Sequence, residues 1–303
     1  MTVTDKAISC ETVVAIGGFN AVHKGHLMLI DEAVDTAKKM HMKSCIYTFD
    51  DRLEQHKGGK KFMPGSEKLK LFEKLGIDVV FVQQFTDEFK SILPEEFVSE
   101  VLVKTLRCKC VIAGENFRFG RNLTGDAEVL KNLCEKYKIK CIIKKLEKTI
   151  GGRVISSSLM REFAAEGKVE KITEYCGRPM CIAGNVVHGR GEGRKMGFAT
   201  ANILQSENDI VPARGVYVSK VMADGKEYTG ITNVGNAPTY DSALQLIETH
   251  LLGFEGDLYD KEIQVYFLEK IRDIEKFNSV KELTIQLEKD NQKAKSISDK
   301  YKL

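Results

Sequence analysis

The pattern of apolar and polar positions changes about halfway along the chain. In the first half, short apolar runs alternate with stretches whose apolar residues recur at spacings of three and four. The runs predict buried strands and the stretches predict helices. The predicted strands are 12–16, 43–49, 79–82, 110–113 and 140–146, and the predicted helices are 26–40, 66–75, 94–105 and 126–137. This order predicts a doubly wound α/β domain with a parallel sheet.

The second half follows a different pattern after a helix-like stretch at 159–174, where Gly177 and Pro179 interrupt the helical periodicity. Short strands with turn residues between them predict a small antiparallel β-barrel. The predicted strands are 181–187, 215–222, 227–234, 245–251 and 262–267. A C-terminal helix is predicted at 279–289. We therefore expect a first domain at 1–168, a linker at 169–180 and a second domain at 181–303.

Composition agrees with two domains of ordinary size, since the chain has 303 residues, of which 43% are hydrophobic. The 46 basic and 43 acidic residues leave a net charge of +3, so no nucleic-acid or membrane surface is expected. No signal-peptide pattern or spanning run is present in the sequence, which favours a cytoplasmic protein. We expect a monomer or weak self-association. The eight cysteines lie mostly in apolar strands, which favours buried free thiols over a zinc site.

A glycine turn and two histidines follow the first predicted strand directly. The segment reads Gly17-Gly18-Phe19-Asn20-Ala21-Val22-His23-Lys24-Gly25-His26. Glycines let a ligand approach the backbone, and a helix N-terminus favours an anion. Two imidazoles can donate hydrogen bonds to charge that builds on phosphate oxygens. The segment predicts a polyphosphate site, whereas a capped helix with packed histidines is the alternative.

Two further segments are expected at the same edge of the sheet, because ligands bind beyond the carboxyl ends of parallel strands. Their polar residues are Asn116, Arg118, Ser156, Ser157, Ser158 and Arg161. Serine hydroxyls at a helix start suit a phosphate, and an arginine one turn later adds a cation. A serine N-cap beside a surface arginine is the alternative, but the nearby histidines favour phosphate binding.

The barrel half carries a glycine-rich basic loop that leads into Thr-x-Asn. The phosphate-binding candidates in the loop are Gly189, Gly191, Gly193, Arg194 and Lys195. Thr200 and Asn202, two apart in extended chain, point the same way and offer two oxygens that suit Mg²⁺. The loop predicts a triphosphate site, although glycine richness alone is equally typical of a flexible hairpin.

These motifs together resemble those of the prokaryotic bifunctional riboflavin kinase/FAD synthetase family, over about residues 12–290. The His-x-Gly-His segment is the signature of the nucleotidylyltransferase superfamily. The other matching segments occur in the order of the family, at 116–120, 156–161, 200–202, 233–239 and 248–259. The resemblance implies that the barrel phosphorylates riboflavin to FMN. It implies that the α/β domain transfers AMP from ATP to FMN, giving FAD and pyrophosphate.

Residue roles follow from the same resemblance. In the kinase step, Glu248 corresponds to the general base of the family, and Thr200 and Asn202 to the residues that hold Mg²⁺ and the phosphates. The residues that the resemblance places in the flavin pocket are Asn233, Arg272, Glu275 and Phe277. In the adenylyl step, His23, His26 and Arg161 would stabilise charge, while Asn116 and the serine run would position a nucleotide or the FMN phosphate.

The sequence departs from the family pattern at four places. Asn20-Ala21 stands for Asp-Gly, Ser158-Leu159-Met160-Arg161 for Thr-x-Ile-Arg, and Ala199 for a proline. The segment 50–57 stands for a Pro-His-Pro-like stretch that helps to bind flavin. Two alternatives therefore stay open beside a bifunctional enzyme. One is an enzyme with a single activity, most simply a riboflavin kinase with a weakened FAD synthetase, and the other is a flavin-sensing regulatory protein.

Overall fold

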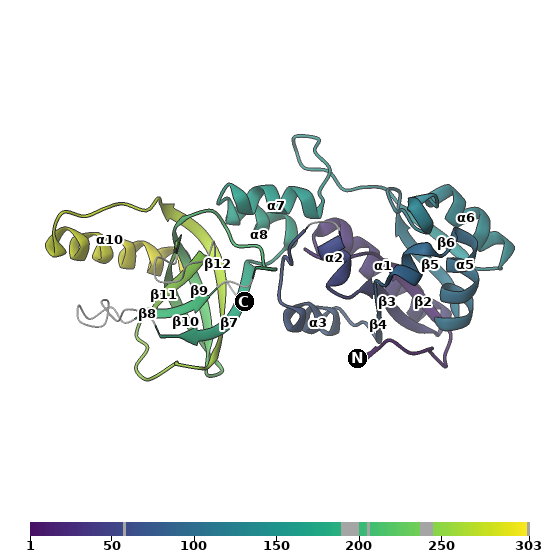
Figure 1. The fold of residues 1–303 in the computed structure, drawn as a ribbon, viewed down its shortest axis with the longest axis horizontal. Helices are drawn as coiled ribbons and strands as arrows, with labels where there is room; N and C mark the ends of the chain where they lie inside the picture. Colours follow the sequence, from purple (N-terminus) through teal and green to yellow (C-terminus); the bar gives the residue numbers. More distant parts are fainter. Residues whose placement is uncertain (57–58, 189–199, 205–206, 237–244, 302–303) are drawn as a thin grey trace. The chain divides into compact units, whose positions relative to one another are not determined.

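The computed structural model describes residues 1–56, 59–188, 200–204, 207–236 and 245–301. The chain divides into two compact units (Figure 1). Unit 1 comprises Met1–Gly59 and Gly65–Ser157, and unit 2 comprises Lys60–Pro64 and Ser158–Leu303. The division falls at the first residues of helix α7 (Ser157–Ala165).

Unit 1 is built on a parallel sheet whose described strands have the order β1-β4-β3-β2-β5-β6. The strands are β1 (Thr2–Thr4), β2 (Thr12–Ile16), β3 (Lys43–Phe49), β4 (Val79–Gln83), β5 (Cys108–Gly114) and β6 (Lys140–Lys144). The order reverses at β2, with β3 and β4 on one side and β5 and β6 on the other. The predicted doubly wound α/β domain is therefore confirmed, and β1 is an edge strand that the periodicity did not predict.

The helices of unit 1 cover this sheet. They are α1 (Lys24–Met40), α2 (Arg52–His56), α3 (Gly65–Lys74), α4 (Asp87–Ser91), α5 (Pro94–Glu96), η1 (Phe97–Thr105), η2 (Arg121–Leu123) and α6 (Ala127–Lys136). Helix α1 packs on β2, β3 and β5. The helix predicted at 94–105 is present as α5 and η1, and η1 is a π-helix that ends where the Leu106 N–H donates to the Val101 carbonyl.

The core of unit 1 explains why β2 has no polar alternation. All five of its residues are buried, as both faces of a central parallel strand are. Aromatic rings fill one side of the sheet, where Tyr47 lies stacked on Phe81 and edge-on to Phe97. Phe97 in turn meets Phe119 from the segment after β5. This packing fixes the strand ends that carry the candidate site.

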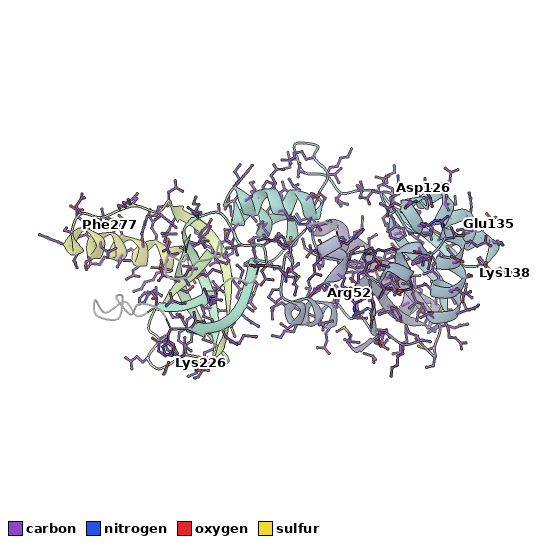
Figure 2. All side chains as sticks on the ribbon, viewed as in Figure 1. Arg52, Asp126, Glu135, Lys138, Lys226 and Phe277 are labelled. Carbon is purple, nitrogen blue, oxygen red and sulfur yellow. The ribbon has the colours of Figure 1, made fainter. Side chains whose placement is uncertain are left out.

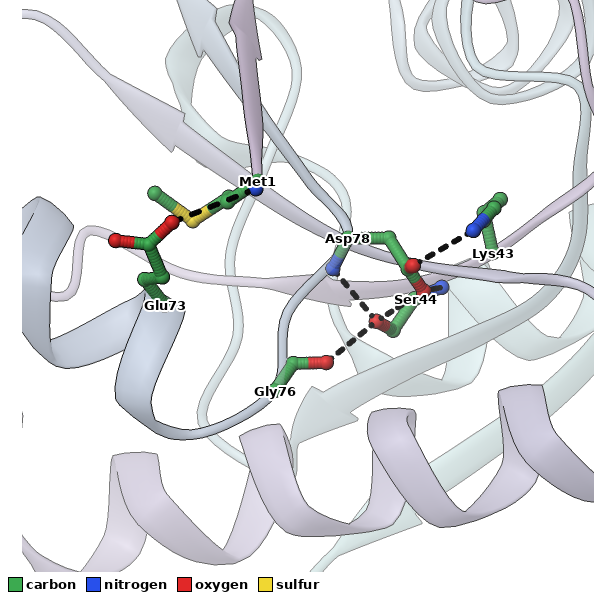
Figure 3. Close-up of polar contacts among 6 residues, drawn as sticks. All are labelled: Met1, Lys43, Ser44, Glu73, Gly76 and Asp78. Atoms are coloured by element: carbon green, nitrogen blue, oxygen red, sulfur yellow. Dashed lines mark hydrogen bonds and ion pairs between the residues drawn. The ribbon is translucent and has the colours of Figure 1, made fainter.

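The amino ends of β3 and β4 are joined by a polar network (Figure 3). Asp78 accepts hydrogen bonds from the Lys43 ammonium at 2.8 Å and from the Ser44 N–H and hydroxyl, each at 2.9 Å. The Ser44 hydroxyl also lies 3.3 Å from the Gly76 carbonyl oxygen. The chain terminus at Met1 forms an ion pair with Glu73 at 3.5 Å. This edge, opposite the carboxyl ends of the strands, is therefore a structural one.

Unit 2 contains a closed antiparallel barrel with the strand order β10-β11-β8-β7-β12-β9 in its described residues. The strands are β7 (Met180–Val187), β8 (Thr200–Leu204), β9 (Gly215–Ala223), β10 (Lys226–Asn236), β11 (Gln245–Leu251) and β12 (Glu262–Arg272). The predicted barrel is confirmed. Strand β8 was not predicted. It has only five residues, and the polar side chains of Thr200 and Asn202 interrupt its apolar pattern.

Three longer helices lie wholly or mostly in the described part of unit 2. The predicted continuous helix at 159–174 is instead two helices, α7 and α8 (Val169–Cys176), separated at Gly167. Gly167 has φ +75°, and a Cβ there would lie 2.9 Å from the Tyr217 hydroxyl oxygen, so the helix cannot continue through it. Helix α8 occupies most of the segment predicted as a linker and packs on β7 and β12.

The closing helix is longer than predicted. Helix α10 runs from Val280 to Ser298, past the predicted end at residue 289, and packs on β9, β10 and β12. In Figure 1 one end of α10 lies near the barrel and the rest of the helix extends away from it. The Ser279 hydroxyl caps its start by accepting the Glu282 N–H at 3.2 Å. The periodicity predicted only the first half of the helix, because its C-terminal half is largely polar.

The segment 60–64 lies in unit 2, although α2 and α3 flank it along the chain. The Lys61 N–H donates to the Asn208 carbonyl at 2.6 Å, and the Ile210 N–H donates back to the Lys61 carbonyl at 2.8 Å. Phe62 is buried. This short piece of extended chain was not anticipated from the sequence.

All eight cysteines are free thiols. Six of them are buried, including Cys45, Cys108 and Cys110 in the strands of unit 1. Burial raises the pKa of the Cys110 thiol to about 11. Such thiols behave as small apolar side chains, as the strand positions predicted.

Candidate functional site

The His-x-Gly-His segment lies at the carboxyl end of β2, where the strand order of unit 1 reverses between β2 and β5. Such a reversal opens the usual ligand crevice of a doubly wound sheet. The loop is held from β3, since the Gly17 N–H donates to the Tyr47 carbonyl at 3.2 Å and the Thr48 hydroxyl donates to the Gly18 carbonyl at 3.1 Å. The loop therefore has a fixed backbone.

Two residues of this loop have left-handed backbone conformations. Phe19 has φ +47° and Val22 has φ +45°, and both are fully buried. A positive φ is rare for residues with a side chain, and rarest for β-branched ones such as valine. The Phe19 ring lies 5.0 Å from the His26 ring and 5.9 Å from Phe72. Core packing of Phe19 therefore stabilises a backbone turn that its own preferences oppose.

The two histidines meet at the start of α1. His23 is the N-cap residue, but its side chain makes no capping hydrogen bond. The two imidazole rings stack with centroids 3.9 Å apart and planes 19° from parallel. A Cβ at Gly25 would lie 3.3 Å from the His23 ring, so Gly25 leaves the space in which that ring lies. The arrangement places two imidazoles beside a helix N-terminus whose first turn carries no acidic residue.

Ser156 and Ser157 approach the same helix start. The carbonyl oxygen of Ile155 lies 3.9 Å from the position that a Cβ of Gly25 would take. The structure therefore brings the start of the serine run, within unit 1, to the N-terminus of α1. Ser158 and Arg161 belong to unit 2, where Ser158 is exposed and Arg161 is half-buried in α7.

Asn116 and Arg118 follow the carboxyl end of β5, as predicted. Both are exposed. The Asn116 side-chain oxygen lies 3.0 Å from the position of a Cβ on Gly114, so that glycine gives the amide room. The Arg118 guanidinium donates to the Phe117 carbonyl at 2.9 Å. These two residues therefore lie at the ligand edge of the sheet.

The segment 50–56, which departs from the family pattern, forms helix α2 beside the glycine turn. Leu53 of α2 is buried, and its side chain lies 3.6 Å from the position of a Cβ on Gly18. Asp50 accepts the N–H groups of Arg52 and Phe85, each at 3.2 Å. Arg52, labelled in Figure 2, also forms an ion pair with Asp50 at 3.0 Å. The substituted sequence thus keeps a folded element against the loop.

Partly exposed aromatic rings gather near this helix, and the sequence analysis missed them. Phe49 lies 5.6 Å from Phe85 and 5.7 Å from Phe89, and His56 lies 5.3 Å from Phe85. Phe117 stacks on Phe119 at 5.4 Å. Flat rings of this kind suit a flat aromatic ligand. The available signal was an aromatic residue at or shortly after a strand end, as for Phe49 in β3, Phe85 after β4 and Phe117 after β5.

In the barrel, three candidate residues lie side by side on neighbouring strands. Asn202 of β8 is the direct cross-strand partner of Glu248 of β11, which is the partner of Asn233 of β10. Directly paired residues of antiparallel strands project to the same face. Asn202, Glu248 and Asn233, called the barrel row below, therefore lie in one line on one face.

The barrel row contains more hydrogen-bond acceptors than the described residues satisfy. Asn233 donates from its amide nitrogen to the Glu248 carboxylate at 3.4 Å. The side-chain oxygens of Asn202 and Asn233 are buried and accept no hydrogen bond within the described part of the chain. A buried polar atom left unsatisfied is costly, so such atoms point to a missing ligand. Two amide oxygens and a carboxylate in one line suit a hard cation or a hydroxyl donor.

Thr200 lies two residues before Asn202 in β8, opposite His250, and is exposed. Residues two apart in a strand share a face, so Thr200 and Asn202 lie as predicted for a pair of oxygen ligands. The glycine and basic candidates Gly189, Gly191, Gly193, Arg194 and Lys195 lie outside the described residues, as does Ala199.

Of the residues carried over to the flavin pocket, Asn233 belongs to the barrel row, and the other three lie at the end of β12 and in the loop after it. Arg272 is the cross-strand partner of Val216, which is in turn the partner of Asn233. The Arg272 guanidinium lies over the Phe277 ring at 5.8 Å, and Figure 2 labels Phe277 in the loop before α10. Glu275 is exposed in the same loop. Sequence reasoning missed the buried Asp290 of α10, which binds Arg272.

No helix among the described residues is long and apolar enough to cross a membrane. In the same residues, no group of three histidine, cysteine or acidic side chains is arranged to hold a metal ion.

Two family models match the chain. The FAD synthetase model matches residues 5–159, and the riboflavin kinase model matches residues 176–298. The first covers the His-x-Gly-His segment and the second covers the barrel row. Each half of the chain therefore has its own family.

Curated relatives match nearly the whole length. Three proteins named bifunctional riboflavin kinase/FMN adenylyltransferase, from Buchnera aphidicola, Bacillus subtilis and Escherichia coli K12, are each 32% identical to this chain. The matches cover 94%, 95% and 92% of this chain and 93%, 93% and 90% of those proteins. Both halves therefore occur together in the relatives.

A solved structure agrees on the fold. A protein from Streptococcus pneumoniae, described as a macrolide-efflux protein, superposes with a TM-score of 0.88 and 28% identity. The match covers 97% of this chain and 99% of that one. Its described activity differs from that of the curated relatives and is a statement about that protein alone.

Proposed function

Because the chain belongs to the bifunctional riboflavin kinase/FMN adenylyltransferase family, we propose that it makes FAD from riboflavin in two steps with the residues described above. The family uses ATP. The first step transfers the γ-phosphoryl group of ATP to the 5′-hydroxyl of riboflavin, giving FMN and ADP. The second transfers AMP from a second ATP to the FMN phosphate, giving FAD and pyrophosphate.

The observation that carries the kinase assignment is the barrel row. Glu248 lies between two amides whose buried oxygens have no partner in the described residues. As general base, Glu248 accepts the proton of the attacking hydroxyl, a role worth ~10²–10⁴ in rate. The Asn233 amide, which donates to the carboxylate, holds it in orientation.

A magnesium ion fits this site by the chemistry of its donors. Mg²⁺ prefers oxygen ligands and keeps several waters, and the Asn202 oxygen is buried and unsatisfied in the described structure. Asn202 and Thr200 would hold it. When bound, the ion offsets the charge of the phosphate oxygens during in-line transfer. The sequence of the loop 189–195, with Arg194 and Lys195, adds cations for the triphosphate.

For adenylyl transfer, the support is the stacked histidine pair at the N-terminus of α1. FMN phosphate attacks the α-phosphorus, and His23 and His26 stabilise the added charge, each donor being worth about 3 kcal/mol when well placed. The N-terminus of α1, whose first turn carries no acidic residue, favours the negative charge of the phosphates beside the fixed loop. Arg161, Asn116, Arg118 and the serines at 156–158 are proposed to complete the nucleotide site.

The aromatic cluster supports FMN binding in unit 1 despite the altered segment 50–57. Phe49, Phe85 and Phe89 present partly exposed rings beside α2, which packs against Gly18. The flavin ring could stack there while its phosphate faces the histidines. This favours a working adenylyl domain over the one-activity alternative. The family-model matches support a functional division into 1–168 for adenylyl transfer and 181–303 for the kinase.

The test is to incubate the purified protein with riboflavin, ATP and Mg²⁺ and to separate riboflavin, FMN and FAD by chromatography, with a parallel reaction started from FMN. FAD from both reactions is the expected result. FMN that accumulates from riboflavin and stays unchanged in the parallel reaction would mean a kinase with a silent adenylyl domain. Flavin binding without ATP consumption would mean a sensor and would contradict the proposal.

A further inference from the structure

Asp290 is a fully buried carboxylate in the middle of α10, outside the barrel row. Its side chain is 0% exposed. It accepts the Arg272 Nε–H at 3.0 Å and the Nη2–H at 2.9 Å on one oxygen, and the Gln286 side-chain amide at 2.9 Å on the other. A buried charge is strongly destabilising unless it is paired and hydrogen-bonded, and a bidentate arginine is the best partner. The helix therefore holds Arg272 in one orientation.

Arg272 transmits this orientation to the loop 273–277. Its Nη1 group donates to the Asp273 carbonyl at 3.2 Å, and its guanidinium lies over the Phe277 ring at 5.8 Å. The arginine side chain is 14% exposed, so water has little access to compete for these contacts. One guanidinium thus ties the start and the end of the loop to α10.

The loop lies beside the barrel row. A Cβ at Gly235 would be 3.7 Å from the Ile274 Cδ1 atom and also 3.7 Å from the Asn233 side-chain nitrogen. Ile274 is 48% exposed, an unusual position for a large apolar side chain next to a polar site. Val218 and Ile231 pack with Ala294 of α10 in one apolar cluster. Because Ile231 and Asn233 share a face, the row lies on the face that α10 covers.

The barrel row has two ends, Asn202 and Asn233, and each end suits a different ligand. Asn202 follows the glycine-rich basic loop in sequence, which suits the triphosphate, and Glu248 lies in the middle as the base. The acceptor hydroxyl must reach Glu248 from the other end, past Asn233 and Ile274. An exposed apolar side chain beside an amide suits a flat, largely apolar ring with a polar chain.

We propose that Asp290 is a positioning residue for the acceptor: through Arg272 it fixes the loop 273–277 against Asn233 and so sets the affinity of the kinase site for riboflavin. This rests on the proposed kinase function. Asp290 touches none of the reacting groups, so it acts on riboflavin binding and not on phosphoryl transfer. The ATP end of the face, at Asn202, lies across Glu248 from the loop.

The test is the full-length Asp290→Asn variant, assayed for FMN formation against riboflavin and ATP separately. We expect the KM for riboflavin to rise at least tenfold, while kcat and the KM for ATP stay within about twofold. Conversion of FMN to FAD by unit 1 reports that the protein is folded. Asp299→Asn, an exposed residue at the end of the same helix, is the matched control and should change nothing.

A double variant separates positioning from stability. Replacing a buried ion pair with apolar residues of similar size is often neutral or stabilising. Arg272→Met with Asp290→Leu should therefore recover the melting temperature lost in Asp290→Asn but keep the raised KM for riboflavin. Recovery of the KM together with the melting temperature would overturn the proposal, as would an unchanged riboflavin KM in Asp290→Asn or an equal rise in both KM values.

The outcomes distinguish this inference from the function on which it rests. If the wild-type chain forms no FMN from riboflavin, the proposed kinase function fails. If the wild type forms FMN and Asp290→Asn binds riboflavin normally, only the role of Asp290 fails. Should Asp290→Asn not fold, Gln286→Leu still decides, because it removes the hydrogen bond to the other oxygen of Asp290 while it keeps Arg272, and its riboflavin KM is either raised or unchanged.

Discussion

The two candidate sites of this chain are assembled by different means. In unit 1, the glycine turn and both histidines follow one another between Gly17 and His26, and the structure has only to fold one turn at a strand end. In unit 2, Asn202, Asn233 and Glu248 come from three strands and meet only through the register of the barrel. The first site therefore depends on local backbone geometry and the second on the pairing of distant segments.

This difference also separates the ways in which each site can fail. The strands of the barrel row pair through their backbones, so a substitution can remove the chemistry of one side chain and leave the strands paired. In the turn of unit 1, Phe19 and Val22 are held at positive φ by their packing, so even a methyl group added nearby can move the histidine side chains. Substitutions in the two sites should therefore give different patterns of loss.

The largest effect is expected for Glu248→Gln. The amide cannot accept the proton of the hydroxyl, so FMN formation should fall by ~10²–10⁴. Conversion of FMN to FAD should be unchanged, because it takes place in unit 1. Both rates are measured by chromatography of the same preparation, with Glu262→Gln, an exposed residue of β12, as the control. Equal loss of both activities would contradict the assignment of Glu248.

A somewhat smaller effect is expected for His26→Ala. Loss of one donor to the transition state should lower FAD synthesis from FMN by ~10²–10³. The kinase of the same chain should work normally and serves as the control for folding. If FAD output in steady-state assays is the same as in the wild type, the stacked histidine pair has no part in adenylyl transfer.

Gly25→Ala tests the dependence of the first site on backbone geometry. A Cβ there would lie 3.3 Å from the His23 ring, which is buried and has little room to shift. A misplacement of about 1 Å can cost ~10²-fold in rate, so a shift of a few tenths should lower FAD synthesis by roughly tenfold. Alanine also favours the helix, by up to ~1 kcal/mol, so thermal stability should not fall with the activity.

The matched control for this variant is Gly65→Ala. Gly65 also stands at a helix start in unit 1, but nothing lies within 4 Å of its added Cβ. FAD synthesis should be unchanged in that variant. If both alanine variants lose the same activity, the cause is general to helix starts and not the contact with His23.

The same difference explains how much could be predicted from the sequence. The positions of β2, β3 and the histidine turn follow from apolar runs and a contiguous motif, because short-range patterns determine them. The alignment of Asn202 with Glu248 and Asn233 does not, since register depends on the whole barrel. Only the resemblance to a family brought these residues together before the structure did.

Other features were missed because a tertiary partner decides them. Asp290 looks like a solvent-facing residue of a charged helix, and only the arrival of Arg272 from β12 makes its burial possible. The π-helical geometry of η1 and the break at Gly167 likewise depend on what packs against them. The aromatic cluster around Phe85 joins Phe49 at the end of β3 to Phe85 and Phe89 after β4, so no short window of sequence contains it.

The smallest effect is expected at the amino edge of the sheet in unit 1, which has no part in either site. Burial alone would raise the pKa of Asp78, but hydrogen bonds from the Lys43 side chain and from Ser44, with the charge of Lys43, lower it below its ordinary value of 3.8. Its contribution to stability is therefore present above that value and is lost as the pH falls through the lowered pKa. Asp78→Asn should cost about 1–2 kcal/mol at neutral pH, somewhat less than the ~1.5–3 kcal/mol of a hydrogen bond to a charged group, because the carboxylate is partly exposed and screened by solvent.

Urea unfolding of the wild type and of Asp78→Asn, measured at several pH values, checks this sign. The difference in unfolding free energy should be constant at neutral pH and shrink below about pH 4, where the carboxylate begins to take up a proton. Both enzymatic activities should stay at wild-type levels, because the network lies at the opposite end of β3 and β4 from the histidine turn. A loss of FAD synthesis would show that the amino edge transmits strain to the carboxyl edge, and the separation of structural and catalytic edges would not hold.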